Sequence, residues 1–119
     1  MIASDRFQPV SRRVLAYCHD SGGIGHLRRT LAICERIGRE YRGTSFLLAT
    51  GTPYVQLLTQ GHAIDYIKLP ALEKAPDGSY QSKLLGLDPE QITKCRKSLL
   101  IETARGFLPH LFLVDKAPL

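Results

Sequence analysis

Cysteine is scarce in this sequence, and its positions suit neither a disulfide framework nor a structural zinc site. Only 3 of the 119 residues are cysteines, and no two of them form a C-x-x-C pair. An odd number without paired spacing is typical of a reducing compartment, so we expect a cytoplasmic protein without a bound metal. Each cysteine falls within an apolar pattern, which predicts buried free thiols at Cys18, Cys34 and Cys95.

Long apolar runs are also missing. No stretch approaches the roughly 20 residues that a membrane-spanning helix requires, and residues 1–13 lack the apolar core of a secretion signal. Leu84, Leu85 and Leu87 are nevertheless unusually apolar for a loop. We expect them to pack as a short helical turn. The alternative is a patch that faces lipid or a partner, which would give a peripheral membrane contact.

Acidic residues are outnumbered by basic ones. The net charge is +5 and 44% of the residues are hydrophobic, which predicts a folded protein with anionic partners such as phosphates or nucleotides. Nucleic-acid modules show interleaved aromatics or a recognition helix, and neither pattern occurs, so we expect no nucleic-acid partner. The length suits one domain, with residues 1–11 as a flexible polar segment and residues 12–119 as the folded part.

Short apolar runs alternate with amphipathic helical patterns along the chain. This order predicts an α/β fold, a Rossmann-like parallel sheet with helices on both faces. Residues 70–87 are rich in proline, glycine and serine and are expected to form a long loop. The expected strands are 13–18, 45–49, 64–69 and 111–114, and the expected helices are 27–41, 52–61 and 88–108.

Helical spacing predicts which faces of the two long helices are buried. Asp88 and Gln91 have the spacing of a capping box at the start of the last helix, while Thr52 and Pro53 suit the cap and first turn of the short one. The expected core faces are Leu27, Leu31, Cys34, Ile37 and Tyr41 in the first helix and Ile92, Cys95, Leu99 and Phe107 in the last.

The most distinctive run is SGGIGHLRR, residues 21–29, which joins the expected first strand to the first helix. Such a turn directs free backbone N–H groups and the positive end of the helix dipole at one spot, and glycine lets a phosphate approach closely. His26 lies at the mouth of the helix, where the neutral, basic form of a histidine is favoured. The run therefore predicts an anion site with a nearby base; a tight turn with a surface histidine is the alternative.

Several familiar glycine-loop chemistries do not fit. A dinucleotide fingerprint would need a third glycine where Arg28 stands and an acidic residue at the end of the second strand, where residues 49–51 read Ala-Thr-Gly. The G-K-[ST] element of a Walker loop and the G-x-S-x-G nucleophile elbow are also absent. These absences argue against a nicotinamide cofactor, a nucleoside-triphosphatase and a serine hydrolase.

The glycine run resembles the first loop of MurG-like glycosyltransferases of the GT-B fold, family 28 and its relatives. A related nucleotide-sugar hydrolase of the pseudaminic acid pathway carries a similar Gly-x-Gly-His-x-x-Arg run, represented here by Gly23, Gly25, His26 and Arg29. Residues 67–70 and 114–119 also resemble a group of predicted glycosyltransferases, so that the likeness covers most of residues 12–119. The sequence departs from the MurG form where Ser21 and Ile24 replace glycines.

This resemblance implies the amino-terminal, acceptor-side half of a GT-B glycosyltransferase. The donor substrate would be a nucleotide-diphosphate sugar, bound mainly by a carboxyl-terminal domain that this sequence lacks, so that the chain alone is expected to be inactive; no further cofactor is implied. His26 would act as the base towards an acceptor hydroxyl, and the alternatives are a nucleotide-sugar hydrolase of the same fold and a non-catalytic anion-binding domain. The residues implied to hold the diphosphate are Gly22, Gly23, Ile24, Gly25 and Arg29.

Other polar residues lie where the strands of such a sheet end, which is where ligands bind. His19 and Asp20 flank the glycine run and are either acceptor contacts or turn residues. Asp115 is either a site residue or the cap of the next turn. The remaining candidates are interpreted as structural: Thr50 and Thr52 as caps, and His62 and His110 as residues of the opposite edge.

Overall fold

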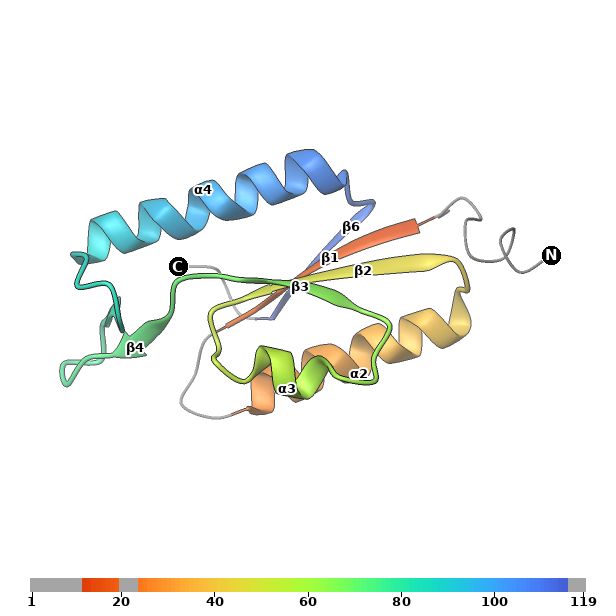
Figure 1. The fold of residues 1–119 in the computed structure, drawn as a ribbon, viewed down its shortest axis with the longest axis horizontal. Coiled ribbons are helices and arrows are strands. Elements are labelled where there is room, and N and C mark those ends of the chain that lie inside the picture. Colours follow the sequence, from red (N-terminus) through yellow and green to blue (C-terminus); the bar gives the residue numbers. More distant parts are fainter. Residues whose placement is uncertain (1–11, 20–23, 116–119) are drawn as a thin grey trace.

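The computed structural model describes residues 12–19 and 24–115, and it is an α/β structure built on a parallel sheet. The sheet has four strands in the order β3-β2-β1-β6, and every neighbouring pair is parallel. Helix α4 lies over one face, and α2 and α3 lie over the other (Figure 1). The expected parallel sheet with helices on both faces is thus confirmed. The strands of this sheet are β1 (Arg12–Cys18), β2 (Thr44–Thr50), β3 (Asp65–Lys68) and β6 (Leu111–Asp115).

The core forms because β1 and β2 are apolar on both faces, as expected for central strands of a parallel sheet. Alternate residues of β1 point to opposite sides: Val14, Ala16 and Cys18 belong to the cluster beneath α2, whereas Tyr17 belongs to the cluster beneath α4. β6 is as apolar as β1 and β2, but it lies at the edge of the sheet. The side chain of its residue Phe112 is therefore exposed.

Helix α2 (Gly25–Glu40) follows the expected apolar stripe, and Leu27, Leu31 and Cys34 are buried against the sheet. The stripe ends earlier than expected. Tyr41 lies beyond the last helical residue and is exposed, with its ring beneath the guanidinium of Arg12. The prediction that Tyr41 packs in the core was therefore wrong, because the chain leaves the helix one residue before that position.

Helix α3 (Val55–Thr59) begins later than the sequence suggested. Its N-cap is Tyr54, without a capping side-chain hydrogen bond, so Thr52 and Pro53 precede the helix and do not start it. Thr52 is instead buried, and its hydroxyl has no hydrogen-bond partner within the described residues. Gly61, with φ of 81°, turns the chain after the helix, as expected.

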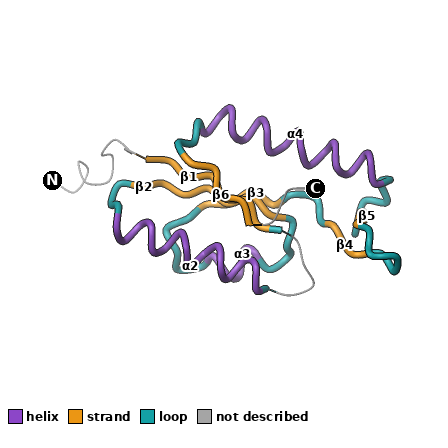
Figure 2. Tube along the Cα trace, turned by 180° about the vertical axis from the view of Figure 1, so that it is seen from behind, coloured by secondary structure: helices purple, strands orange, loops and turns teal. Residues whose placement is uncertain are grey.

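The expected long loop contains a β-hairpin, which the sequence analysis missed. Strands β4 (Leu72–Lys74) and β5 (Tyr80–Ser82) pair antiparallel and form a separate two-stranded sheet. The turn between them uses Asp77, whose carboxylate accepts from the backbone N–H of Ser79, and Gly78, whose φ is 88°. The hairpin and the start of α4 project together from one end of the main sheet (Figure 2).

Helix α4 (Pro89–Phe107) begins with the expected capping box, in which Asp88 and Gln91 exchange side-chain and backbone hydrogen bonds. Its buried face differs from the prediction. Ile92 is buried, but Leu99 is 39% exposed and Arg96 is fully buried in its place. The apolar stripe was thus assigned to the wrong side of the helix around this turn.

Leu84 and Leu85 do not pack as a helical turn. Both follow β5 in a bend and are 79% and 57% exposed, so that expectation was wrong. A lipid or partner contact through them stays a prediction. In the described part of the chain, no helix is both long and apolar enough to cross a membrane.

The thiols are expected to react in the order of their exposure. Burial raises the pKa of Cys34 to about 11, and the thiolate is the reactive form, so Cys34 should resist alkylation at pH 8. Cys95 is partly exposed and should be modified first, while buried Cys18 should wait for unfolding. Iodoacetamide labelling followed by peptide mass spectrometry tests this, with guanidinium-unfolded protein as the control. Equal rates at Cys34 and Cys95 in the folded protein would contradict it.

Candidate functional site

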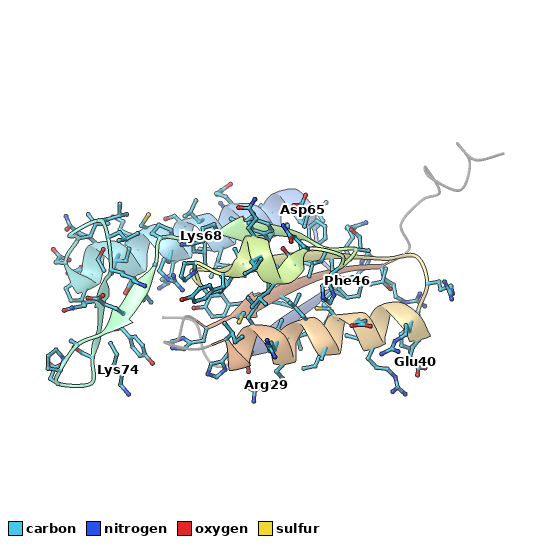
Figure 3. All side chains as sticks on the ribbon, turned by 60° about the horizontal axis from the view of Figure 1, so that its bottom comes forward. Arg29, Glu40, Phe46, Asp65, Lys68 and Lys74 are labelled. Carbon is cyan, nitrogen blue, oxygen red and sulfur yellow. The ribbon has the colours of Figure 1, made fainter. Side chains whose placement is uncertain are left out.

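The candidate site lies where the parallel strands end. The register places Cys18 beside Thr50 on one side and beside Asp115 on the other, so the ends of these three strands lie at one edge of the sheet. Helix α2 starts from the same edge, and Arg29 lies near its beginning whereas Glu40 marks its far end (Figure 3). Residues far apart in sequence therefore meet here because β6 is inserted directly beside β1.

His26 and Asp115 form the centre of the site. The distance between His26 Nδ1 and Asp115 Oδ2 is 2.7 Å. The carboxylate side chain is only 14% exposed, while the imidazole is 30% exposed. Asp115 was considered either a site residue or a cap, and the structure brings it to the predicted base. An imidazole held on one nitrogen by a shielded carboxylate is the arrangement of a general base.

The hydrogen bonds determine which nitrogen of His26 is free. An ionised carboxylate only accepts, so at this distance Nδ1 carries the proton and donates it to Asp115. A guanidinium nitrogen of Arg29 also lies 3.2 Å from Nδ1, but a protonated Nδ1 has no lone pair for it. We therefore assign the close Asp115 contact as the hydrogen bond. The other ring nitrogen, Nε2, then carries the lone pair of the neutral ring.

Arg29 holds the opposite oxygen of the same carboxylate. Its Nη2 donates to Asp115 Oδ1, and the arginine side chain is 59% exposed. Burial raises the pKa of Asp115, but hydrogen bonds from Arg29 and His26 and their charges outweigh it, so the pKa lies below its usual value. Asp115 is thus a carboxylate near neutral pH. The predicted contact of Arg29 with a phosphate stays a prediction, and its exposed N–H groups are available for one.

The glycine run is only partly within the described residues. Gly22, Gly23 and the neighbouring Asp20 lie outside them, so their predicted roles are untested. Ile24 is the N-cap of α2 and has no side-chain capping bond, and its carbonyl accepts from the N–H of Arg28. Gly25 is the first helical residue, and a Cβ added there would meet nothing within 4 Å. Among the described residues, space is therefore left beside Gly25 at the start of α2.

His19 brings the hairpin to this edge. It is buried at the end of β1, and its Nε2 lies 2.9 Å from the hydroxyl of Tyr80 on β5. The His19 ring meets the His26 ring edge to face, with centroids 5.9 Å apart. Sequence reasoning proposed His19 but not Tyr80, because nothing local signalled that residues 80–82 form a strand.

The four residues that the sequence analysis interpreted as structural are Thr50, Thr52, His62 and His110. Thr50 was predicted to be a cap, but the N-cap of α3 is Tyr54, so that prediction was wrong; the Thr50 hydroxyl instead accepts from the backbone N–H of Thr52. The buried, unpaired hydroxyl of Thr52 was not anticipated. His110 accepts from the backbone N–H of Arg13 and joins β6 to the start of β1, so it is structural as expected. His62 lies in the segment before β3, beside a hollow of about 340 Å³ that Phe46 also lines.

That hollow does not belong to the candidate site. It lies between the second half of α2 and the segment 61–64, away from His26 and Asp115. Its lining combines core side chains such as Leu31 and Phe46 with polar ones such as Glu35 and His62, and it includes neither His26 nor Asp115. Among residues 12–19 and 24–115, no group of three histidine, cysteine, aspartate or glutamate side chains is arranged to hold a metal ion.

Comparison with known proteins does not extend this description. The chain matches no known protein family, no curated protein and no solved structure. The function must therefore be argued from the site itself.

Proposed function

We propose that this chain is the acceptor-side half of a glycosyltransferase that moves a sugar from a nucleotide-diphosphate sugar to an acceptor hydroxyl. The observation that carries the proposal is the hydrogen bond from His26 to Asp115, because it leaves Nε2 as a base at the ligand-binding edge of a parallel sheet. The resemblance of residues 21–29 to the first loop of MurG-like enzymes supports the choice of substrate.

His26 is the base in the proposed transfer reaction. Its Nε2 takes the proton of the acceptor hydroxyl while the oxygen attacks the anomeric carbon. The bond from that carbon to the diphosphate oxygen breaks, and the nucleoside diphosphate leaves with the electron pair. Asp115 stabilises the imidazolium that forms. The open N-terminus of α2 and the exposed N–H groups of Arg29 would stabilise the negative charge of the diphosphate.

The same base could serve two neighbouring functions. With water in place of the acceptor hydroxyl, the reaction is that of a nucleotide-sugar hydrolase. Without a donor, the start of α2 would only bind an anion. In the proposed transferase the donor is bound mainly by a second domain, so the assay must use the native gene product.

Replacing His26 by alanine tests the proposal. The native product is incubated with uridine-, guanosine-, thymidine- and cytidine-diphosphate sugars together with a mixture of hydroxyl acceptors, and release of nucleoside diphosphate is measured. We expect His26→Ala to lower release by about 10²–10⁴-fold, the usual contribution of a general base. His62→Ala, in the segment before β3 and beside the second half of α2, should leave it unchanged.

The products distinguish the alternatives. A glycoside indicates a transferase, and free sugar indicates a hydrolase. Full turnover by His26→Ala would remove His26 from the mechanism, and lack of release from every donor would favour the anion-binding domain.

A further inference from the structure

Hydrogen bonds close the β4–β5 hairpin at its turn and at its base. Its strands pair from Leu72↔Ser82 to Lys74↔Tyr80, and its turn is closed by Asp77. The backbone N–H of Lys83 donates to the carbonyl of Ala71 at the base of the hairpin. Tyr80 therefore lies on a strand that is held at both ends of the hairpin.

Tyr80 connects this arm to the predicted base through a single intermediate ring. Its hydroxyl lies 2.9 Å from His19 Nε2, and the two rings meet edge to face with centroids 5.0 Å apart. The His19 ring in turn meets the His26 ring at 84°. Edge-to-face rings at such separations are in attractive contact. The order of contacts is Tyr80, His19, His26 and Asp115.

We propose that Tyr80 is a positioning residue of the candidate site, which acts through His19 to hold the orientation of the His26 ring. The inference rests on the proposed role of His26 as a base. Asp115 holds His26 at Nδ1 only, and a ring held at one atom can still tilt about that hydrogen bond. The buried His19 ring supplies the second constraint, because it packs against the ring itself. Tyr80 fixes His19 by its hydrogen bond.

The geometry also connects the position of the hairpin with that of the predicted base. The hairpin is joined to the main sheet's edge at Tyr80, so a shift of the arm would move His19 and then His26. A misplacement of about 1 Å can lower a rate by about 10²-fold. Tyr80 thus makes the hairpin a part of the catalytic arrangement and not merely an anchored projection.

Tyr80→Phe tests this inference because it retains the ring and removes the hydroxyl. The native product with ¹⁵N-labelled histidine is studied by long-range ¹H–¹⁵N spectroscopy, which reports the tautomer and environment of each ring nitrogen. We expect the His26 signals to shift or broaden in Tyr80→Phe. The control is Tyr66→Phe, a partly buried tyrosine of β3, which should leave them unchanged. Changes confined to His19 would overturn the proposal.

Turnover supplies a second readout. We expect Tyr80→Phe to lower kcat by about tenfold or more, with little change in KM. In a His19→Phe background, Tyr80→Phe should cause no additional loss, whereas additive losses would overturn an action through His19. If no donor is consumed at all, the proposed function fails, while the spectra still decide whether Tyr80 orients His26. If His26→Ala abolishes turnover but Tyr80→Phe alters neither spectra nor kcat, only the positioning role fails.

Discussion

Replacing Asp115 by asparagine is expected to lower turnover of the native product by about 10²–10⁴-fold, nearly as much as the loss of His26. The amide is nearly the same size as the carboxylate, but its NH₂ group can donate a hydrogen bond to Nδ1 and favour the other tautomer of His26. The lone pair then faces the protein and Nε2 carries the proton, so the base is lost. A change of this kind lowers kcat by about 10⁴ in a serine-protease triad.

Asp65→Asn is the matched control for this substitution. Asp65 is an exposed strand residue at the opposite edge of the sheet, where its carboxylate accepts from the N–H of Tyr66. Turnover should be unchanged in this variant. Thermal unfolding of both variants shows whether the fold is retained. Full turnover by folded Asp115→Asn would exclude the His26–Asp115 pair from the mechanism.

Asp115→Asn is also expected to change how the free energy of unfolding depends on pH. The pKa of Asp115 is lowered in the folded protein, since hydrogen bonds from Arg29 and His26 outweigh burial. Its contribution to stability is therefore fully present above the ordinary aspartate pKa of about 3.9, and it is lost as the pH falls through the folded value. Urea unfolding should show a wild-type advantage over Asp115→Asn at neutral pH that shrinks below pH of about 4.

The sequence was sufficient for the elements whose signals are local. The apolar runs of β1 and β2 predicted central strands, and Asp88 with Gln91 marked the start of α4. Gly25 and His26 lie at the start of α2, as predicted, because the amphipathic helical pattern begins there. Each of these signals needs only a few neighbouring residues.

The parts that failed depend on distant contacts. Asp115 meets His26 across 89 positions, and no local pattern separates a strand-end carboxylate that caps a turn from one that holds a histidine. β5, which carries Tyr80, has only 3 residues, too few for a visible alternation. These two contacts depend on the strand order and on the docking of the hairpin, and the neighbouring residues in the sequence predict neither of them.

The burial of Arg96 in the core was likewise not predictable from neighbouring residues, and its replacement is expected to have a large effect on stability. A charged residue in a helix is normally assigned to solvent, yet Arg96 is 0% exposed. Its Nη1 donates to the carbonyl of Pro70 at 2.6 Å and its Nη2 to the hydroxyl of Tyr17 at 2.8 Å. The side chain thus joins α4 to β1 and to the segment that follows β3.

Arg96→Met is expected to lower the free energy of unfolding by about 2–4 kcal/mol. Methionine fills much of the space but cannot donate, so the Pro70 carbonyl and the Tyr17 hydroxyl lose these donors inside the protein, at about 1–3 kcal/mol for each buried group. Urea unfolding measures the loss. The free energy of unfolding of Arg96→Lys should lie between those of the wild type and Arg96→Met. An ammonium keeps the charge but lacks the planar fork that reaches both acceptors.

A double substitution separates the hydrogen bond from the packing. Removal of both partners of a buried hydrogen bond costs less than removal of one, and Tyr17→Phe removes the hydroxyl that Arg96→Met leaves behind, although the Pro70 carbonyl stays. Tyr17→Phe combined with Arg96→Met should therefore be more stable than additive single losses predict. If Arg96→Met were as stable as the wild type, the buried guanidinium would contribute no net stability. In that case the attachment of α4 would depend on Ile92 and Leu100, the apolar residues of the same face.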